Sequence, residues 1–379
     1  MKKMKKFISI LVVALSIMAI ISTSSLFAFA MENQVQITEP TPLLDEDGKL
    51  TKPGYCVTNL YEYDRSKIKA NATRIKEWDF YQISNDRYCV QITIADISLG
   101  GAVTVGIFDM KTGKEYSKMI LKLFTFGKMG MSKDAMKPHS YSFHKHNFDF
   151  DLEVTEEKRI IKFSGKKNFK DFNIDLELAM LPDHESLVMA VPFGENDGKH
   201  FYYNQKVNCM AAKGTVTYGD LNVEFKGKED NSYCVLDWGR GVWPYHEVWW
   251  WGNGSTTLQD GSIFGWEIGW GFGDMSAASE NTLFYNGKAH KIGVLKLENE
   301  KEVKKNWTGT TWKITSDDGR FEMTMEPVFD HITRLRFLFV GNICHQVFGK
   351  WNGYVILDDG TKLEIHDMMS FLECSDNMW

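Results

Sequence analysis

The residues best suited to chemistry gather in one aromatic segment, between Trp238 and Trp270. Asp237, Arg240 and Glu267 bring charges to this segment, which holds seven of the twelve tryptophans of the chain. A few polar groups that converge inside an apolar, aromatic wall are the usual pattern of a small-molecule pocket. The predicted chemistry is recognition of an apolar ligand, with rings around its body and charges at its polar end.

The candidate ligand-binding residues are polar or aromatic members of this segment: Arg240, Trp243, Tyr245, Trp249, Trp250, Trp251 and Trp266. Asp237 and Glu267 are the candidate catalytic residues, because burial among rings raises the pKa of a carboxyl and makes it a general acid. The alternative is structural: Asp237 and Arg240 form an ion pair that fixes the loop, and the rings are core. The residues alone leave both interpretations open.

The elements that must position these side chains are strands. Residues 246–252 are typical of a strand, on which Trp249 and Trp251 share one face and Trp250 lies on the other. A partner strand over 262–272 holds Trp266 and Glu267 among glycines, which leave room for bulky neighbours.

Short β-rich runs separated by turns fill the rest of the chain. Asp-Gly turns at 317–319 and 358–360 lie between alternating segments and predict hairpins, whereas the best helix candidate, 131–137, is short. The number of antiparallel strands is larger than one open sheet usually contains without curling or splitting. The predicted fold is therefore all-β, with two packed antiparallel β-barrel or β-sandwich units that join near residues 200–215. We expect an N-terminal arm over 31–54, a first β-unit over 55–210, and a second over 211–379 that carries the Asp-Trp-Gly-Arg-Gly-Val-Trp-Pro-Tyr motif.

The first thirty residues predict a signal peptide. Four lysines precede an apolar run over 7–21, and Ala28-Phe29-Ala30 supplies a cleavage site, so we expect an exported protein, secreted or held in the cell envelope. The run is shorter than the about 20 residues of a spanning helix, although its extension to Ala30 leaves a membrane anchor over 7–30 as the alternative. Loss of the four lysines takes the formal charge from -6 to -10, which argues against a nucleic-acid partner.

Several other classes of site lack their motifs. The six cysteines contain no Cys-x-x-Cys pair, and His144 and His146 have no further ligand at suitable spacing, so no metal site is expected. Nucleotide-binding loops and the hydrolase Gly-x-Ser-x-Gly motif are also missing, and we expect no cofactor. Buried free thiols are the simplest interpretation of the cysteines, but a disulfide stays open.

Several motifs together resemble one known family. They are the long motif over 237–245, the Trp-x-Trp-Gly stretch over 249–252, residues 269–273, Glu280-Asn281, residues 312–320, Glu326-Pro327 and residues 371–379. From about Ile37 to Trp379 the chain resembles the uncharacterised domain-of-unknown-function family 2804. That family is similar in arrangement to tandem lipocalin-like proteins, which include carotenoid hydratases, tocopherol-cyclase-like enzymes and ceramide-handling proteins. The resemblance implies two lipocalin-like barrels with an apolar ligand site.

Three functions follow as hypotheses. The first is binding of a hydrophobic small molecule or lipid in an aromatic β-barrel cavity. The second is an enzyme, a hydratase, cyclase or isomerase of an apolar lipid or isoprenoid, with Asp237 or Glu267 as proton donor and rings that stabilise a carbocation. The third is carbohydrate binding or hydrolysis, which needs Glu247 and Glu267 as a carboxylate pair about 5 to 9.5 Å apart.

Overall fold

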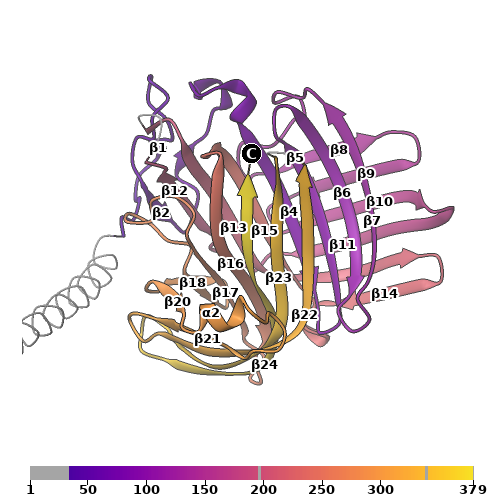
Figure 1. The fold of residues 1–379 in the computed structure, drawn as a ribbon, viewed down its shortest axis with the longest axis vertical. Helices are drawn as coiled ribbons and strands as arrows, with labels where there is room; N and C mark the ends of the chain where they lie inside the picture. Colours follow the sequence, from indigo (N-terminus) through magenta and orange to yellow (C-terminus); the bar gives the residue numbers. More distant parts are fainter. Residues whose placement is uncertain (1–33, 195–197, 338–339, 379) are drawn as a thin grey trace, which may run out of the picture.

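The computed structural model describes residues 34–194, 198–337 and 340–378, and these form an almost entirely β structure (Figure 1). The one α-helix in these ranges is the single turn α2 (Glu300–Val303), and short 3-10 turns lie at η1 (Arg65–Lys67), η2 (Ala72–Arg74) and η4 (Gly227–Glu229). Residues 131–137, the helix candidate, are irregular. In the described ranges, no helix has the length and apolar character needed to cross a membrane. The predicted signal peptide, residues 1–30, lies outside them.

The larger sheet is antiparallel and takes its strands from the first two thirds of the chain. Its main path runs through β7 (Lys114–Leu123), β6 (Gly100–Asp109), β5 (Tyr88–Asp96), β4 (Lys76–Ser84), β15 (Tyr233–Val242), β13 (Phe201–Tyr218), β11 (Lys170–Ala179), β10 (Lys158–Lys167), β9 (Phe148–Val154) and β8 (His139–His144). Three further strands extend this sheet. β12 (Leu187–Pro192) pairs with the first part of β13 and with β2 (Gly54–Cys56), and β14 (Leu221–Lys226) pairs with the last part of β13.

The smaller sheet contains the rest of the chain in antiparallel order. Its path is β19 (Lys288–Lys291), β18 (Thr282–Tyr285), β17 (Ile263–Trp270), β16 (His246–Thr257), β24 (Lys362–Met378), β23 (Val340–Ile356), β22 (Phe321–Phe337), β21 (Trp312–Ser316) and β20 (Leu295–Leu297). Both predicted Asp-Gly hairpins are present, and Gly319 and Gly360 adopt the positive φ that such turns need. The prediction of an all-β chain with two packed antiparallel units is confirmed.

The boundary between the sheets differs from the expected one. The region near 200–215 lies inside β13, a strand that no proline interrupts and that has a bulge at Asn208 and Cys209. The chain instead changes sheet between Val242 and His246, where Pro244 prevents the strand from continuing. Most of the long motif therefore belongs to the larger sheet, in which β15 pairs with β13 and β4.

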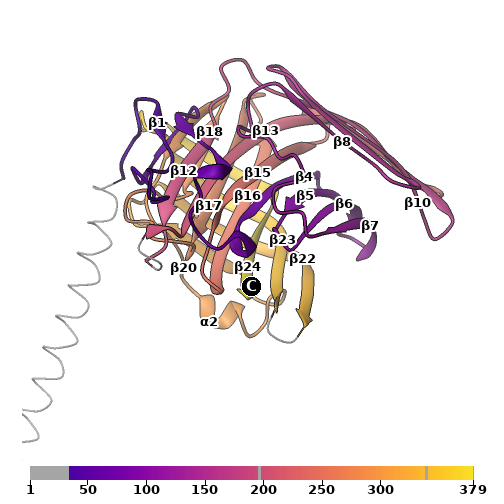
Figure 2. The same cartoon turned by 90° about the horizontal axis from the view of Figure 1, so that it is seen from above.

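Alternation of apolar and polar residues explains how each sheet builds its own core. In β9, for example, Phe148, Phe150 and Leu152 are buried, while the residues between them are exposed. Figure 2 shows the hairpins of β8 and β10 projecting from one end of the larger sheet. The two sheets meet through a third apolar cluster, in which Phe108 of β6 packs against Phe348 of β23, and Phe80 of β4 against Trp251 of β16.

The N-terminal arm and two short strands complete the fold. From Gln34 onward the arm contacts both sheets, since Val35 donates to the carbonyl of Ala277 and Ile37 to that of Tyr55. The short strands β1 (Thr41–Pro42) and β3 (Tyr61–Glu62) pair in parallel and bring Leu43 into the core of the larger sheet.

Candidate functional site

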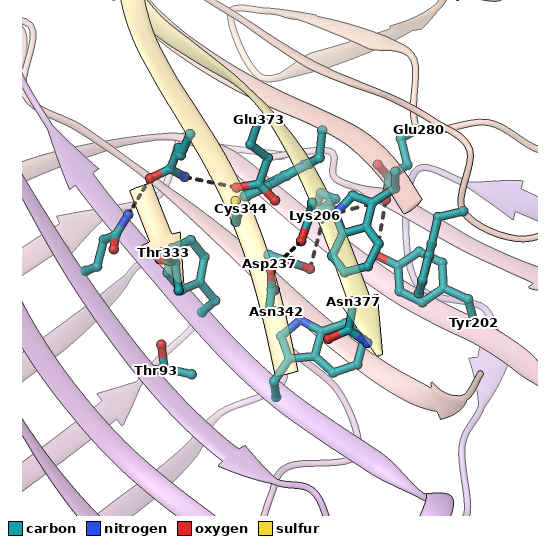
Figure 3. A pocket seen from close by; sticks show the side chains of 18 of the residues that line it. Thr93, Tyr202, Lys206, Asp237, Glu280, Thr333, Asn342, Cys344, Glu373 and Asn377 are labelled. Carbon is teal, nitrogen blue, oxygen red and sulfur yellow. Dashed lines mark hydrogen bonds and ion pairs between the residues drawn. The ribbon is translucent and has the colours of Figure 1, made fainter. Parts of the chain in front are cut away.

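A cavity of about 360 Å³ lies between the two sheets. Large rings form much of its wall: Trp78, Phe80, Tyr202, Trp243, Trp249, Trp251 and Phe272. Polar side chains from both sheets complete it: Gln91, Thr93, Lys206, Asp237, Glu280, His331, Thr333, Asn342, Cys344, Gln346, Glu373, Ser375 and Asn377. In Figure 3 Asp237, Lys206, Glu280 and Glu373 converge, and Thr93 lies apart from them.

Lys206 is the buried cation at the centre of the polar cluster. Its Nζ lies 3.0 Å from Asp237 Oδ1 and 3.6 Å from a carboxylate oxygen of both Glu267 and Glu280. The ammonium also lies 4.2 Å from the ring centroid of Trp251, a cation-π contact. Burial by itself would lower the pKa of Lys206, but the three carboxylates more than offset it and raise the pKa.

Glu267 lies behind the cavity wall and is completely buried. It accepts hydrogen bonds from the indole N–H of Trp251 and from the amides of Asn208 and Asn253, at 3.2 and 3.0 Å. Burial raises its pKa, and Lys206 opposes part of that rise. Glu267 therefore holds Lys206 and Trp251 in place from behind.

Glu280 and Glu373 face the cavity itself. Glu280 accepts a hydrogen bond of 3.1 Å from the hydroxyl of Tyr202, and burial raises its pKa. Burial raises the pKa of Glu373 from 4.5 to about 7, against the opposing influence of Lys206. Gln346 donates to Glu373 at 3.2 Å, and its own carbonyl accepts from Gln91 at 2.7 Å, which fixes the direction of the amide.

The cluster holds more acid than base. Four carboxyls, Asp237, Glu267, Glu280 and Glu373, surround Lys206, so full ionisation would leave a net negative charge in a largely buried site. Because a buried charge without a partner is costly, part of the cluster holds its protons near neutral pH. Perturbed acids of this kind are concentrated at functional sites.

The cavity brings together four of the predicted site residues: Asp237, Trp243, Trp249 and Trp251. Trp249 and Trp251 share a face of β16, as the alternation predicts. The ring of Trp243 lines the cavity, but its indole N–H is buried and has no hydrogen-bond partner within the described ranges.

Arg240 does not line the cavity. Alternation along β15 directs it to the face opposite Asp237, where it donates to the carbonyls of Trp78 and Ser132 and pairs with Asp79 at 2.9 Å. The structural alternative of an Asp237–Arg240 ion pair is therefore wrong: Asp237 pairs with Lys206.

The remaining predicted residues also lie elsewhere. Trp250 packs against Trp270 in the core of the smaller sheet, and Trp266 packs against Trp351 in the same core. Tyr245 is 43% exposed at the change of sheet, and Glu267 is hidden as described above.

Sequence reasoning missed Lys206, Glu280 and Glu373 as site residues. The available signal was a lone charge within an apolar strand, as for Lys206 in 201–211 and Glu373 in 371–374. Such a charge is seldom buried without a partner. The partners, however, come from distant parts of the chain.

Other predicted sites are readily placed. Glu267 is opposite Asn253 on β16, six residues from Glu247, so the two carboxyls are about 20 Å apart and cannot form a glycosidase pair. Within the described ranges, no three His, Cys, Asp or Glu side chains are grouped to hold a metal. His144 instead contacts Asp149 and Asp151, and all six cysteines are buried free thiols.

The family model described as Domain of unknown function (DUF2804) matches residues 34–379. The chain belongs to this family. No curated protein matches the sequence at significant similarity.

Two solved structures are similar to this family member at low identity. The AttH-like protein of Nitrosomonas europaea is 11% identical, with a TM-score of 0.47 over 83% of this chain and 96% of its own. Kievitone hydratase from Nectria haematococca is 10% identical, with a TM-score of 0.46 over 84% of this chain and 92% of its own.

Proposed function

We propose that this chain is an exported protein that binds a small, largely apolar molecule in the cavity between its two sheets. The observation that carries the proposal is the cavity itself, whose aromatic walls surround a compact polar cluster. A volume of about 360 Å³ is within the range of small-molecule sites. The rings remove the ligand's apolar body from water, and the cluster around Lys206 fixes its polar end.

The rings of Trp78, Trp243 and Trp249 support ligand binding over a purely structural role, because each is only partly buried although it lies between the two sheets. An apolar ligand in the cavity would remove more of their surface from water. The export that we propose rests on the sequence pattern of residues 1–30.

Titration with the neutral apolar dye N-phenyl-1-naphthylamine tests the proposal. Thr333 lines the cavity, whereas Ile332, its neighbour on β22, is 41% exposed. Thr333→Trp should fill the cavity and weaken dye binding at least about tenfold, and the matched Ile332→Trp variant should bind normally. Equal binding by both variants would place the dye elsewhere and contradict the proposal.

A second candidate function is acid catalysis on the bound molecule, by a hydratase, cyclase or isomerase of an apolar lipid or isoprenoid. The cavity-facing carboxyl of Glu373 favours it, because a pKa of about 7 suits proton donation at neutral pH. Incubation of a cellular lipid extract in deuterium oxide should give a product labelled on carbon with the wild type and none with Glu373→Gln. Equal labelling with both proteins would remove Glu373 as the proton donor.

A further inference from the structure

The cavity has an excess of acidic groups where the ligand's polar end would lie. Asp237, Glu280 and Glu373 line it, and Lys206 is already shared between two of them and the hidden Glu267. Lys291 lies near Glu280, but burial lowers its pKa to about 7, so it supplies only part of a positive charge at neutral pH. The protein's own cations therefore do not balance these carboxyls.

The rings beside these acids form a surface that suits a cation. Trp78 stacks on Tyr202, with centroids 6.0 Å apart, and Trp249 contacts Phe272 at 4.9 Å. One ammonium group of the protein already uses a neighbouring ring, since Lys206 lies over Trp251. Aromatic cages of this kind bind organic ammonium ions.

An acceptor without a partner in the described ranges lies beside Asp237, behind the cavity lining. Asn204 is completely buried, and its amide N–H₂ donates to Asp237 at 2.7 Å. Its carbonyl oxygen has no hydrogen-bond partner among the residues that the structure describes. Because side chains alternate along β13, Asn204 is on the same face as Tyr202 and Lys206, which line the cavity. This unpaired oxygen adds a further acceptor to a region that already holds Asp237, Glu280 and Glu373.

We infer that the polar end of the bound molecule is a cation, a protonated amine on an otherwise apolar body, held by Glu280, Glu373 and the surrounding rings. This inference rests on the proposed function, because it names the ligand chemistry of that same cavity. The ligand's positive charge lets these carboxyls ionise without leaving a buried charge unpaired. A carboxylate ligand of the same size would instead add to the negative charge.

Three probes with the same eight-carbon chain separate the possibilities: octylammonium, 1-octanol and octanoate. Calorimetric titration at pH 7 should give octylammonium the tightest binding, about tenfold tighter than octanol, and octanoate the weakest. Octanol or octanoate binding as tightly as octylammonium, or more tightly, would overturn the inference and leave the proposed function standing. If none of the three binds, the proposed function fails and the inference falls with it.

Variants test which carboxyl binds the ammonium group. Glu373→Gln should lower octylammonium affinity to about that of octanol while leaving octanol binding unchanged. The matched Glu364→Gln variant, at a more exposed position on β24, should bind both probes as the wild type does. Octylammonium binding near pH 7 should also release protons from the cluster, seen as a dependence of the binding heat on the buffer's ionisation heat. Unchanged octylammonium affinity in a folded Glu373→Gln variant, with no proton release, would contradict the inference.

Discussion

Lys206 and Asp237 lie directly opposite each other on β13 and β15, with Nζ 3.0 Å from Oδ1. The pair joins the two central strands of the larger sheet at the cavity wall. It also links the sheets, because the same ammonium is near Glu267 on β17 and Glu280 just before β18. We therefore expect stability and ligand recognition to depend on the same buried cation.

Replacement of Lys206 by Met should destabilise the protein by about 3 to 5 kcal/mol, because it leaves neighbouring buried carboxylates without their cation. Urea unfolding followed by circular dichroism measures the change. Lys158→Met, which removes a half-exposed ion pair with Glu177, is the control and should cost less than about 1 kcal/mol. A Lys206→Met protein as stable as this control would show that the cluster does not need its cation.

Replacement of Arg240 by Met should destabilise the fold by a similar amount, about 3 to 5 kcal/mol, since Asp79 then loses its buried partner. Protein that remains folded should bind N-phenyl-1-naphthylamine normally, because Arg240 faces away from the cavity. Dye titration of the folded fraction at low temperature measures this. Loss of dye binding at unchanged stability would instead show that Arg240 takes part in binding.

Stability should depend on pH through Glu373. Its carboxyl has a pKa of about 7 in the folded protein and near 4.5 when unfolded, so the folded state holds the proton over a window in which the unfolded state releases it. The stabilisation that this bound proton gives the folded state is fully present below about pH 4.5 and is lost as pH rises through about 7. Between those limits the free energy of unfolding of the wild type should fall by about 1 to 2 kcal/mol relative to that of Glu373→Gln. This is less than the full pKa difference would give, because the carboxyl borders an open cavity.

Unfolding free energies at several pH values measure this difference. Glu364→Gln is the control and should follow the wild type, since its carboxyl is half exposed beside Lys362. A constant difference between the wild type and Glu373→Gln across the window would contradict the raised pKa.

Replacement of Gly239 by Ala should disturb the cavity wall. A Cβ at this position would overlap the indole ring of Trp78, which must then shift. We expect a loss of about 1 to 3 kcal/mol in stability and weaker dye binding. Gly100→Ala on β6 is the matched control, because its nearest neighbour would be 3.6 Å from the new Cβ. Normal dye affinity in Gly239→Ala would show that the position of Trp78 is not needed for binding.

Secretion by a host cell should yield a chain that begins at Met31, because the residues before it match a signal peptide. Intact mass of the exported protein and amino-terminal sequencing measure the cleavage. A chain that keeps residues 1–30 and sediments with membranes would support the anchor instead.

The parts of the fold that depend on neighbouring residues could be predicted from the sequence. Asp-Gly turns and strict alternation revealed the hairpin of β21 and β22, and the same alternation separated Trp250 from Trp249 and Trp251. The sheet to which β15 belongs could not be predicted, because it depends on pairing with β4, more than a hundred residues earlier. A strand that no short turn joins to its partner also gives no local sign of which strand it pairs with.

The candidate site was only partly predictable for the same reason. Tryptophan density located one wall of the cavity, but Lys206 and Glu373 reach it from other strands and stand alone in apolar sequence. Arg240, three residues from Asp237, faces the other side of the same strand. Closeness in sequence suggested a pair that the geometry of a strand does not allow.

Native mass spectrometry of freshly purified protein tests the central claim, that the cavity holds a small molecule, most directly. The wild type and Ile332→Trp should each carry a small-molecule adduct that organic extraction removes, while Thr333→Trp, prepared identically, should show the mass of the chain alone. An adduct of equal occupancy on Thr333→Trp, or bare chain mass for all three proteins after gentle preparation, would contradict the claim.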